Sequence, residues 1–170
     1  MTDKQFSSVM LTGHRPQALT SEEIAWSKRE LYRTLRRLKE FHGIEEVISG
    51  FALGADTWWA QYALELELPL AAYIPFEDQP KKWPAEQQRT WRKLRTAASR
   101  EVVLGTEYQV WLLHARNDAM IKDAELCVAL WKQSKQNGGT FSAVKKLRAQ
   151  GKPLILLDPE LKEITTENLD

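Results

Sequence analysis

Short apolar runs alternate with longer helix-forming runs along the whole chain. The apolar runs predict six strands, which end at a glycine, a proline or a polar turn, over residues 6–12, 46–49, 70–74, 100–104, 125–131 and 153–157. The stretches between them predict helices over residues 20–42, 55–68, 84–98, 110–122 and 140–150. Strands that are apolar throughout are buried on both faces, so this alternation indicates a parallel sheet covered by helices on both sides.

The first predicted helix carries the clearest boundary signals. Thr20 and Glu23 have the spacing of a capping box, and Gly43 ends the helical pattern. Its apolar stripe consists of Ile24, Leu31, Leu35 and Leu38. Because no linker divides the chain, we expect one α/β, Rossmann-like domain over residues 1–158, with a mainly parallel sheet of about six strands and an ancillary tail over residues 159–170.

Composition and charge narrow the functional classes. The chain has 24 basic and 23 acidic residues and a net charge of +1, so no global field favours nucleic acid, which is an unlikely partner on this ground. No signal-peptide core or membrane-length apolar run is present, and we therefore expect a cytoplasmic protein without membrane contact. The three histidines have no metal-like spacing, so no metal site is predicted.

Three glycine-containing turns connect a predicted strand to a predicted helix. Such turns expose unpaired N–H groups beside the positive end of a helix dipole, which suits a phosphate group. The carboxyl ends of parallel strands meet at one edge of the sheet, where ligands of this fold class bind. The turns contribute Gly13, His14 and Arg15, then Ser49, Gly50, Gly54, Ala55 and Asp56, and finally Gly138, Gly139 and Thr140.

Side-chain roles near these turns stay open at the level of sequence. Asp56 either accepts hydrogen bonds from ligand hydroxyls or caps the helix that follows it. Arg116 and Met120 share a helix face and border a ligand together with Asn117, or they are an exposed arginine beside a core methionine. Periodic positions predict core packing for four tryptophans, namely Trp26, Trp91, Trp111 and Trp131.

Together these segments resemble the SLOG superfamily, which unites Smf/DprA recombination mediators with LOG phosphoribohydrolases, and they look most like its YpsA-like branch. The resemblance runs from Leu11–Arg15 through Ser49–Asp56 and Arg116–Met120 to Gly138–Thr140. It implies a Rossmannoid pocket for a nucleotide or nucleotide-derived ligand, with no cofactor required. Related Rossmannoid proteins often pair through helices, and the sequence leaves a homo-oligomer open.

One departure from the LOG enzymes bears on catalysis. Their Pro-Gly-Gly-x-Gly-Thr-x-x-Glu motif ends in a glutamate that helps N-glycosidic cleavage, whereas this chain has Ala143 at that position and Asn137 in place of the proline. Asp56, Glu77 and Asp118 are the substitute catalytic candidates.

Three functions follow from the sequence, and whether the chain is an enzyme stays open. The first is binding or sensing of a nucleotide-derived ligand, and the second is N-glycosidic or other nucleotide hydrolysis. The third is single-stranded DNA binding as in DprA, suggested by the basic residues between Lys81 and Arg95.

Overall fold

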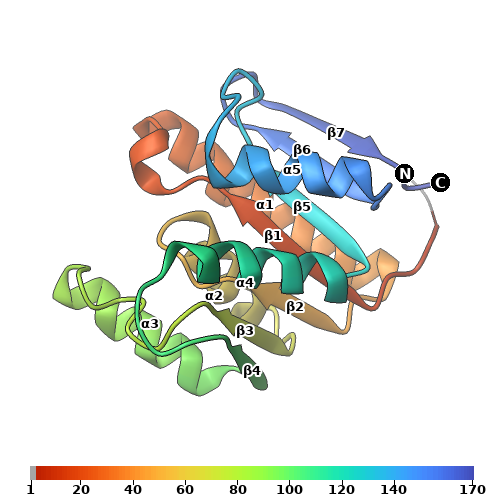
Figure 1. Ribbon diagram of the computed structural model, residues 1–170. Coiled ribbons are helices and arrows are strands. Elements are labelled where there is room, and N and C mark those ends of the chain that lie inside the picture. The colour runs from red at the N-terminus through yellow and green to blue at the C-terminus, as the bar shows by residue number, and fades with distance from the viewer. Residues whose placement is uncertain (1–2) are drawn as a thin grey trace.

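A computed structural model describes residues 3–170, so residues 1 and 2 of the predicted domain lie outside the described part. A seven-stranded sheet with the order β4-β3-β2-β1-β5-β6-β7 forms its centre (Figure 1). The strands are β1 Ser8–Gly13, β2 Glu46–Ser49, β3 Leu70–Ile74, β4 Arg100–Val103, β5 Leu126–Leu130, β6 Leu154–Asp158 and β7 Glu163–Glu167. The helices are α1 Ser21–His42, α2 Ala55–Glu65, α3 Ala85–Ala97, α4 Val110–Asp123 and α5 Gly138–Ala149, with a short 3-10 turn η1 at Pro16–Ala18.

Helices cover both faces of the sheet, as the alternating pattern predicted (Figure 1). α1, α2 and α3 pack on one face, where Leu35, Trp59 and Trp91 belong to the larger apolar core. α4 and α5 pack on the other face, where Met120 and Val144 belong to the second core. The strands from β1 to β6 pair in parallel, which confirms the Rossmann-like α/β class.

The boundaries of α1 follow from the signals in its sequence. The Thr20 side chain accepts a hydrogen bond from the backbone N–H of Glu23 at 3.1 Å, and the Thr20 N–H donates to the Glu23 carboxylate at 2.8 Å. Gly43 ends the helix with a φ of +67°, a left-handed conformation that favours glycine. Leu31, Leu35 and Leu38 are buried as the stripe predicted, and Ile24 packs against them at the margin of the core.

The predicted strand count is short by one, because the tail adds β7 to the sheet. β7 pairs antiparallel with β6, from Leu154 opposite Glu167 to Asp158 opposite Glu163. Four of its five residues are exposed, so the segment carries neither an apolar run nor a buried alternating face. Its pairing with β6 depends on a tertiary contact that a local pattern does not contain.

The core assignment of the tryptophans is right for three and wrong for Trp111. Trp26, Trp91 and Trp131 are buried, whereas Trp111 keeps 60% of its surface exposed. The buried face of α4 passes through Leu112, Arg116, Met120 and Ile121. Trp111 precedes the first of these by one residue, and neighbours on a helix point about 100° apart.

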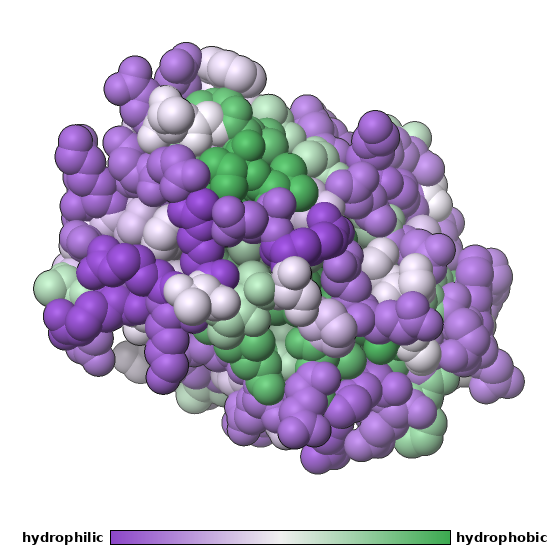
Figure 2. All heavy atoms as spheres, turned by 90° about the horizontal axis from the view of Figure 1, so that it is seen from below, coloured by the Kyte–Doolittle hydropathy of each residue, from purple (hydrophilic) through white to green (hydrophobic). Residues whose placement is uncertain are grey.

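The side of the molecule that carries α3 and β4 is mostly hydrophilic, with separate apolar areas between the polar side chains (Figure 2). Many of the polar side chains on α3 are exposed, among them Arg89, Arg92 and Lys93. No helix within residues 3–170 has both the length and the apolar character needed to cross a membrane.

Candidate functional site

A cavity of small-molecule size lies where the order of the strands reverses. From β1 the chain builds the sheet outward through β2, β3 and β4, and it then returns to the other side of β1 to form β5. A cavity of about 530 Å³ opens beyond the carboxyl ends of β1 and β5, the position where ligands bind in open α/β sheets. Its volume is typical of small-molecule sites, which span about 300–1,000 Å³.

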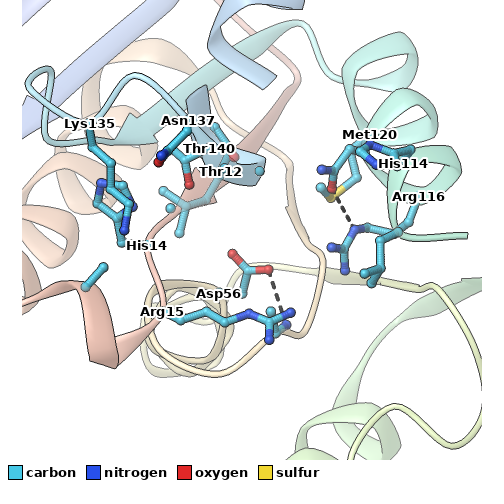
Figure 3. A pocket seen from close by; sticks show the side chains of 18 of the residues that line it. Thr12, His14, Arg15, Asp56, His114, Arg116, Met120, Lys135, Asn137 and Thr140 are labelled. Carbon is cyan, nitrogen blue, oxygen red and sulfur yellow. Dashed lines mark hydrogen bonds between the residues drawn. The ribbon is translucent and has the colours of Figure 1, made fainter. Parts of the chain in front are cut away.

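Ten of the fourteen sequence-predicted binding residues line this cavity (Figure 3). They are Gly13, His14, Arg15, Asp56, Arg116, Asn117, Met120, Gly138, Gly139 and Thr140. The other four do not line the cavity but contact residues that do, and they are Ser49, Gly50, Gly54 and Ala55. The sheet therefore brings together three turns and one helix that are far apart along the chain.

Gly13 lets the turn after β1 pack directly on the start of α2. A side-chain carbon at Gly13 would lie 2.6 Å from the Cβ of Ala55, closer than two such atoms approach in proteins. Gly54 is the N-cap of α2 and has a φ of +86°, which a residue with a side chain rarely adopts. Gly54 and Ala55 thus shape the wall without lining it, whereas Gly13 also lines the cavity.

His14 is held as a neutral ring beside two lysines. The backbone N–H of Lys132 donates to His14 Nε2 at 2.9 Å, which leaves the ring proton on Nδ1. Burial, together with Lys135 and Lys132, lowers the pKa of His14 to about 4. In Figure 3 His14 and Lys135 lie side by side, across the cavity from Arg116. The ring can therefore donate a hydrogen bond from Nδ1 at neutral pH.

The first turn of α5 forms an open wall with the character of an anion site. Asn137 is the N-cap, and its side chain makes no capping hydrogen bond with the described residues. The first-turn N–H groups of a helix have no partner within the helix, and they carry the positive end of its dipole. A side-chain carbon built at Gly138 or Gly139 would have no other atom within 4 Å, so this turn is open to an incoming group. The cationic side chains of Arg15 and Lys135 border the same cavity.

The opposite wall contains the buried pair Asp56 and Arg116. Asp56 Oδ2 accepts a hydrogen bond from the N–H of Ala52 at 3.2 Å. Arg116 Nη1 donates to the carbonyl of Gly50, and its Nε donates to Asn117 Oδ1 at 2.8 Å. Because the N-cap of α2 is Gly54, the interpretation of Asp56 as a helix cap is wrong. Arg116 is likewise a buried residue of this wall and not an exposed arginine.

Burial dominates the ionisation of this pair. It raises the pKa of Asp56 from 3.8 to about 6, although Arg116, the Ala52 N–H and Arg15 all favour the carboxylate. Burial also lowers the pKa of Arg116, while Asp56 opposes that shift. A carboxyl that titrates near neutrality beside a cavity can exchange a proton with a bound molecule.

The two other catalytic candidates lie outside the cavity. Glu77 forms an ion pair with Arg95 at 2.6 Å, which lowers the pKa of Glu77. Asp118 forms an ion pair with Lys146 at 2.7 Å on the exposed side of α4. Asp56 is thus the one candidate of the three that lines the cavity. Within residues 3–170, no group of three histidine, cysteine, aspartate or glutamate side chains could hold a metal ion.

Several lining residues escaped the sequence analysis. Lys135 lies three residues before Gly138, and its nearness to the glycine pair was a usable signal. Asn137 was recognised as the residue in place of the LOG proline but was not predicted to contact the ligand. The remaining lining residues are Leu11, Thr12, Gln17, Ala18, Ala52, Leu113 and His114. Leu11, Thr12 and Ala52 lie within the stretches, in β1 and after β2, that carried the family resemblance. The other four reach the cavity through the packing of η1 and α4, for which the sequence carries no local signal.

Comparisons with solved structures support the fold. The chain resembles DNA processing protein A from Streptococcus pneumoniae with a TM-score of 0.63 and 16% identity, over 89% of this chain and 50% of that one. It thus spans half the length of the pneumococcal protein. A structure on the single-stranded DNA binding mode of DNA processing protein A from Helicobacter pylori matches with a TM-score of 0.67 and 18% identity, over 91% and 70% of the two chains. The structure of TM1055 matches with a TM-score of 0.56 and 20% identity, over 89% and 74%.

Sequence comparisons identify the family. The UPF0398 protein OB1025 of Oceanobacillus iheyensis is 23% identical over 133 residues, which are 72% of each chain. The family model described as the YspA SLOG family matches residues 9–160, a range that includes every residue that lines the cavity. The family match agrees with the expected SLOG relationship, and the chain therefore belongs to the YspA SLOG family.

Proposed function

We propose that the chain binds a small, phosphate-bearing, nucleotide-derived ligand in the cavity between β1 and β5. One observation carries this proposal: the open first turn of α5 and the cations Arg15 and Lys135 border the same cavity. N–H groups at a helix start, reinforced by cationic side chains, are a common arrangement for binding phosphate.

The buried wall supplies the recognition of the ligand's sugar. Asp56 Oδ2 is occupied by the Ala52 N–H, whereas no donor from residues 3–170 makes a hydrogen bond with Oδ1. A carboxylate oxygen facing a cavity accepts hydrogen bonds from ribose hydroxyls. His14 Nδ1–H, on another side of the cavity, is a donor suited to a sugar or phosphate oxygen.

Calorimetric titration with ribose 5-phosphate, AMP, ADP and ADP-ribose tests the proposal. We expect at least one of these compounds to bind and to raise the melting temperature by mass action. The double variant Arg15→Ala/Lys135→Ala should weaken binding by about tenfold or more, since each contact to a charged group contributes about 1.5–3 kcal/mol. Lys122→Ala, an exposed lysine of α4 outside the cavity, is the matched control. Absence of binding by all four compounds would contradict the proposal.

Hydrolysis of the N-glycosidic bond is a second candidate, favoured by the pKa of about 6 for Asp56. In such a step water adds to the ribose carbon while the leaving base takes up a proton, and a group titrating near neutrality can transfer it. Chromatography of nucleoside monophosphates after incubation should detect free base, and Asp56→Asn should lower its release by about 100-fold or more. An Asp56→Asn variant with the rate of the parent protein would contradict this role.

Binding of single-stranded DNA is a third candidate, favoured by the structural likeness to DNA processing protein A from Helicobacter pylori. The exposed basic residues Lys81, Lys82, Arg92 and Lys93 are the candidate contacts. Binding of labelled oligonucleotide should fall steeply as salt rises, because bound cations release counterions from the phosphates. A protein that binds no oligonucleotide even at low salt would contradict this candidate.

A further inference from the structure

A second, smaller cavity adjoins the main one. It has a volume of about 280 Å³ and shares Arg15 and Leu113 with the main cavity. The loop after β3 and the loop that precedes α4 provide the rest of its wall, namely Phe76, Asp78, Gln79, Lys81, Lys82, Trp83 and Tyr108. A molecule that occupies both cavities must pass Arg15, the cation that the proposed phosphate site uses.

Aromatic rings dominate the apolar part of this second cavity. Phe76 is buried, with 5% of its surface exposed, and it packs edge to face against Tyr108 with ring centres 5.5 Å apart. Tyr108 keeps 62% of its surface exposed although it is held by this contact. Trp83 is half-buried in the same wall. Aromatic faces of this kind bind flat, delocalised rings by stacking.

Asp78 supplies a hydrogen-bond acceptor without a partner. Its Oδ1 is screened from solvent, and no donor among residues 3–170 reaches it. Both ends of the neighbouring Gln79 amide already have a partner, because its Nε2 donates to the Gly50 carbonyl at 3.1 Å and its Oε1 accepts from Trp91 Nε1 at 2.8 Å. The χ2 torsion of aspartate is soft, so a modest turn presents Oδ1 to a donor bound in the cavity. A buried acceptor without a donor is costly, and a ligand that provides one removes that cost.

We infer that this second cavity binds the base of the ligand, and that it selects bases with an exocyclic amino group. This inference rests on the proposed function, because the sugar and phosphate then lie in the main cavity beyond Arg15. A carboxylate only accepts hydrogen bonds, so Asp78 pairs with the amino group of adenine or cytosine and repels the keto oxygen of hypoxanthine or uracil. Stacking on Trp83 and Tyr108 holds the ring.

The test compares ligands that differ only in this group. We expect AMP to bind with an affinity about tenfold or more above that of IMP, and CMP to bind more tightly than UMP by a similar factor. Ribose 5-phosphate, which has no base, should bind most weakly. Asp78→Asn introduces an amide that also donates, and it should reduce the preference of AMP over IMP to about threefold or less. Tyr108→Ala should lower the affinity for AMP roughly 5- to 100-fold and leave the affinity for ribose 5-phosphate unchanged, because only AMP carries a base that can stack on the ring.

Trp111→Ala is the matched control, because Trp111 is equally exposed on the same segment and lies outside both cavities. AMP and IMP binding with equal affinity would overturn the inference while leaving the phosphate site intact. An equal loss for AMP and ribose 5-phosphate in Tyr108→Ala would overturn it as well. If none of these compounds binds the parent protein, the proposed function and the inference fall together.

Discussion

The first turn of α5 and the wall built by Asp56 and Arg116 border the same cavity, but they have opposite physical character. At Gly138 and Gly139 there is open space where a side chain would be, whereas at Gly50 an added carbon would lie 2.8 Å from Arg116 Nη1. One wall offers unpaired N–H groups to solvent, and the other holds two ionisable groups in a tightly packed interior. Changes in the open wall should therefore alter binding without destabilising the fold, whereas changes in the buried wall should weaken both binding and stability.

The largest expected effect comes from Arg116→Met. This change leaves the Asp56 carboxyl buried without its neighbouring cation and leaves the Gly50 carbonyl without that donor. Removing one partner of a buried pair of opposite charges lowers the free energy of unfolding by about 3–5 kcal/mol, which urea denaturation measures. The exposed Arg15→Ala should stay within about 0.5 kcal/mol of the parent protein. Equal losses in the two variants would contradict the difference between the walls.

The second prediction concerns pH. The raised pKa of Asp56, from 3.8 to about 6, means that the folded state binds more protons there, so this group lowers stability as the pH rises from about 4 to 6. The pKa of His14 is lowered from 6.5 to about 4, so this group raises stability as the pH rises from about 4 to 6.5. Between about pH 4 and 6 the two groups therefore change the free energy of unfolding in opposite directions.

Removing either group should reveal the slope of the other. In Asp56→Asn the free energy of unfolding should rise with pH between 4 and 6.5, by on the order of 3 kcal/mol relative to the parent protein. In His14→Gln it should fall with pH over about the same window, because Asp56 then titrates alone. Denaturation series at several pH values measure both slopes, and variants whose profiles run parallel to that of the parent would refute these pKa shifts.

A smaller effect is expected from a single methyl group in the buried wall. In Gly50→Ala the new carbon would lie 3.0 Å from both Arg116 Cζ and Asp56 Oδ2, and overpacking of this kind costs about 1–3 kcal/mol. Gly139→Ala places the same methyl group in open space and should not destabilise the protein. Thermal unfolding compares the two variants. If Gly139→Ala were less stable than Gly50→Ala, the assignment of an open wall at Gly139 and a tightly packed wall at Gly50 would be wrong.

The smallest change in stability, with the opposite sign, is expected from Gly139→Asp. A negative charge in the first turn of α5 complements the helix dipole and should stabilise the fold by about 0.3–1 kcal/mol. The same charge should weaken binding of ribose 5-phosphate by about tenfold, or about 1.4 kcal/mol, through repulsion. The neutral Gly139→Asn serves as the control in calorimetry. Unchanged phosphate affinity in Gly139→Asp would place the phosphate elsewhere.

Local signals in the sequence were sufficient for most of the fold. The Thr20 capping box and Gly43 set the limits of α1, and continuous apolar runs such as Leu126–Leu130 marked the buried parallel strands. The exposed strand Glu163–Glu167 lacked such a run and was missed. Trp111 was placed in the core because its apolar character was read without the phase of the helix that carries it.

Site residues in short glycine-containing turns could be predicted from the sequence. Site residues whose properties depend on tertiary packing could not. Gly13, Gly138 and Gly139 stand out in the sequence because each follows a strand and precedes a helical segment. The environment of Asp56 could not be derived in the same way. Its burial, its hydrogen bond from Ala52 and its charge coupling to Arg116 depend on how α2 and α4 meet the end of β2.

The position of β7 at the end of the sheet has a consequence for how the protein avoids self-association. β6 is apolar from residue 154 to 157, and as an edge strand it would present a row of unpaired backbone groups to other chains. β7 covers those groups, and its own outer edge is flanked by Glu163 and Glu167 at either end. Charged residues on an edge strand discourage intermolecular pairing of the kind that seeds aggregates. The polar segment without a recognisable pattern thus shields the backbone groups of the apolar strand β6 from pairing with another chain.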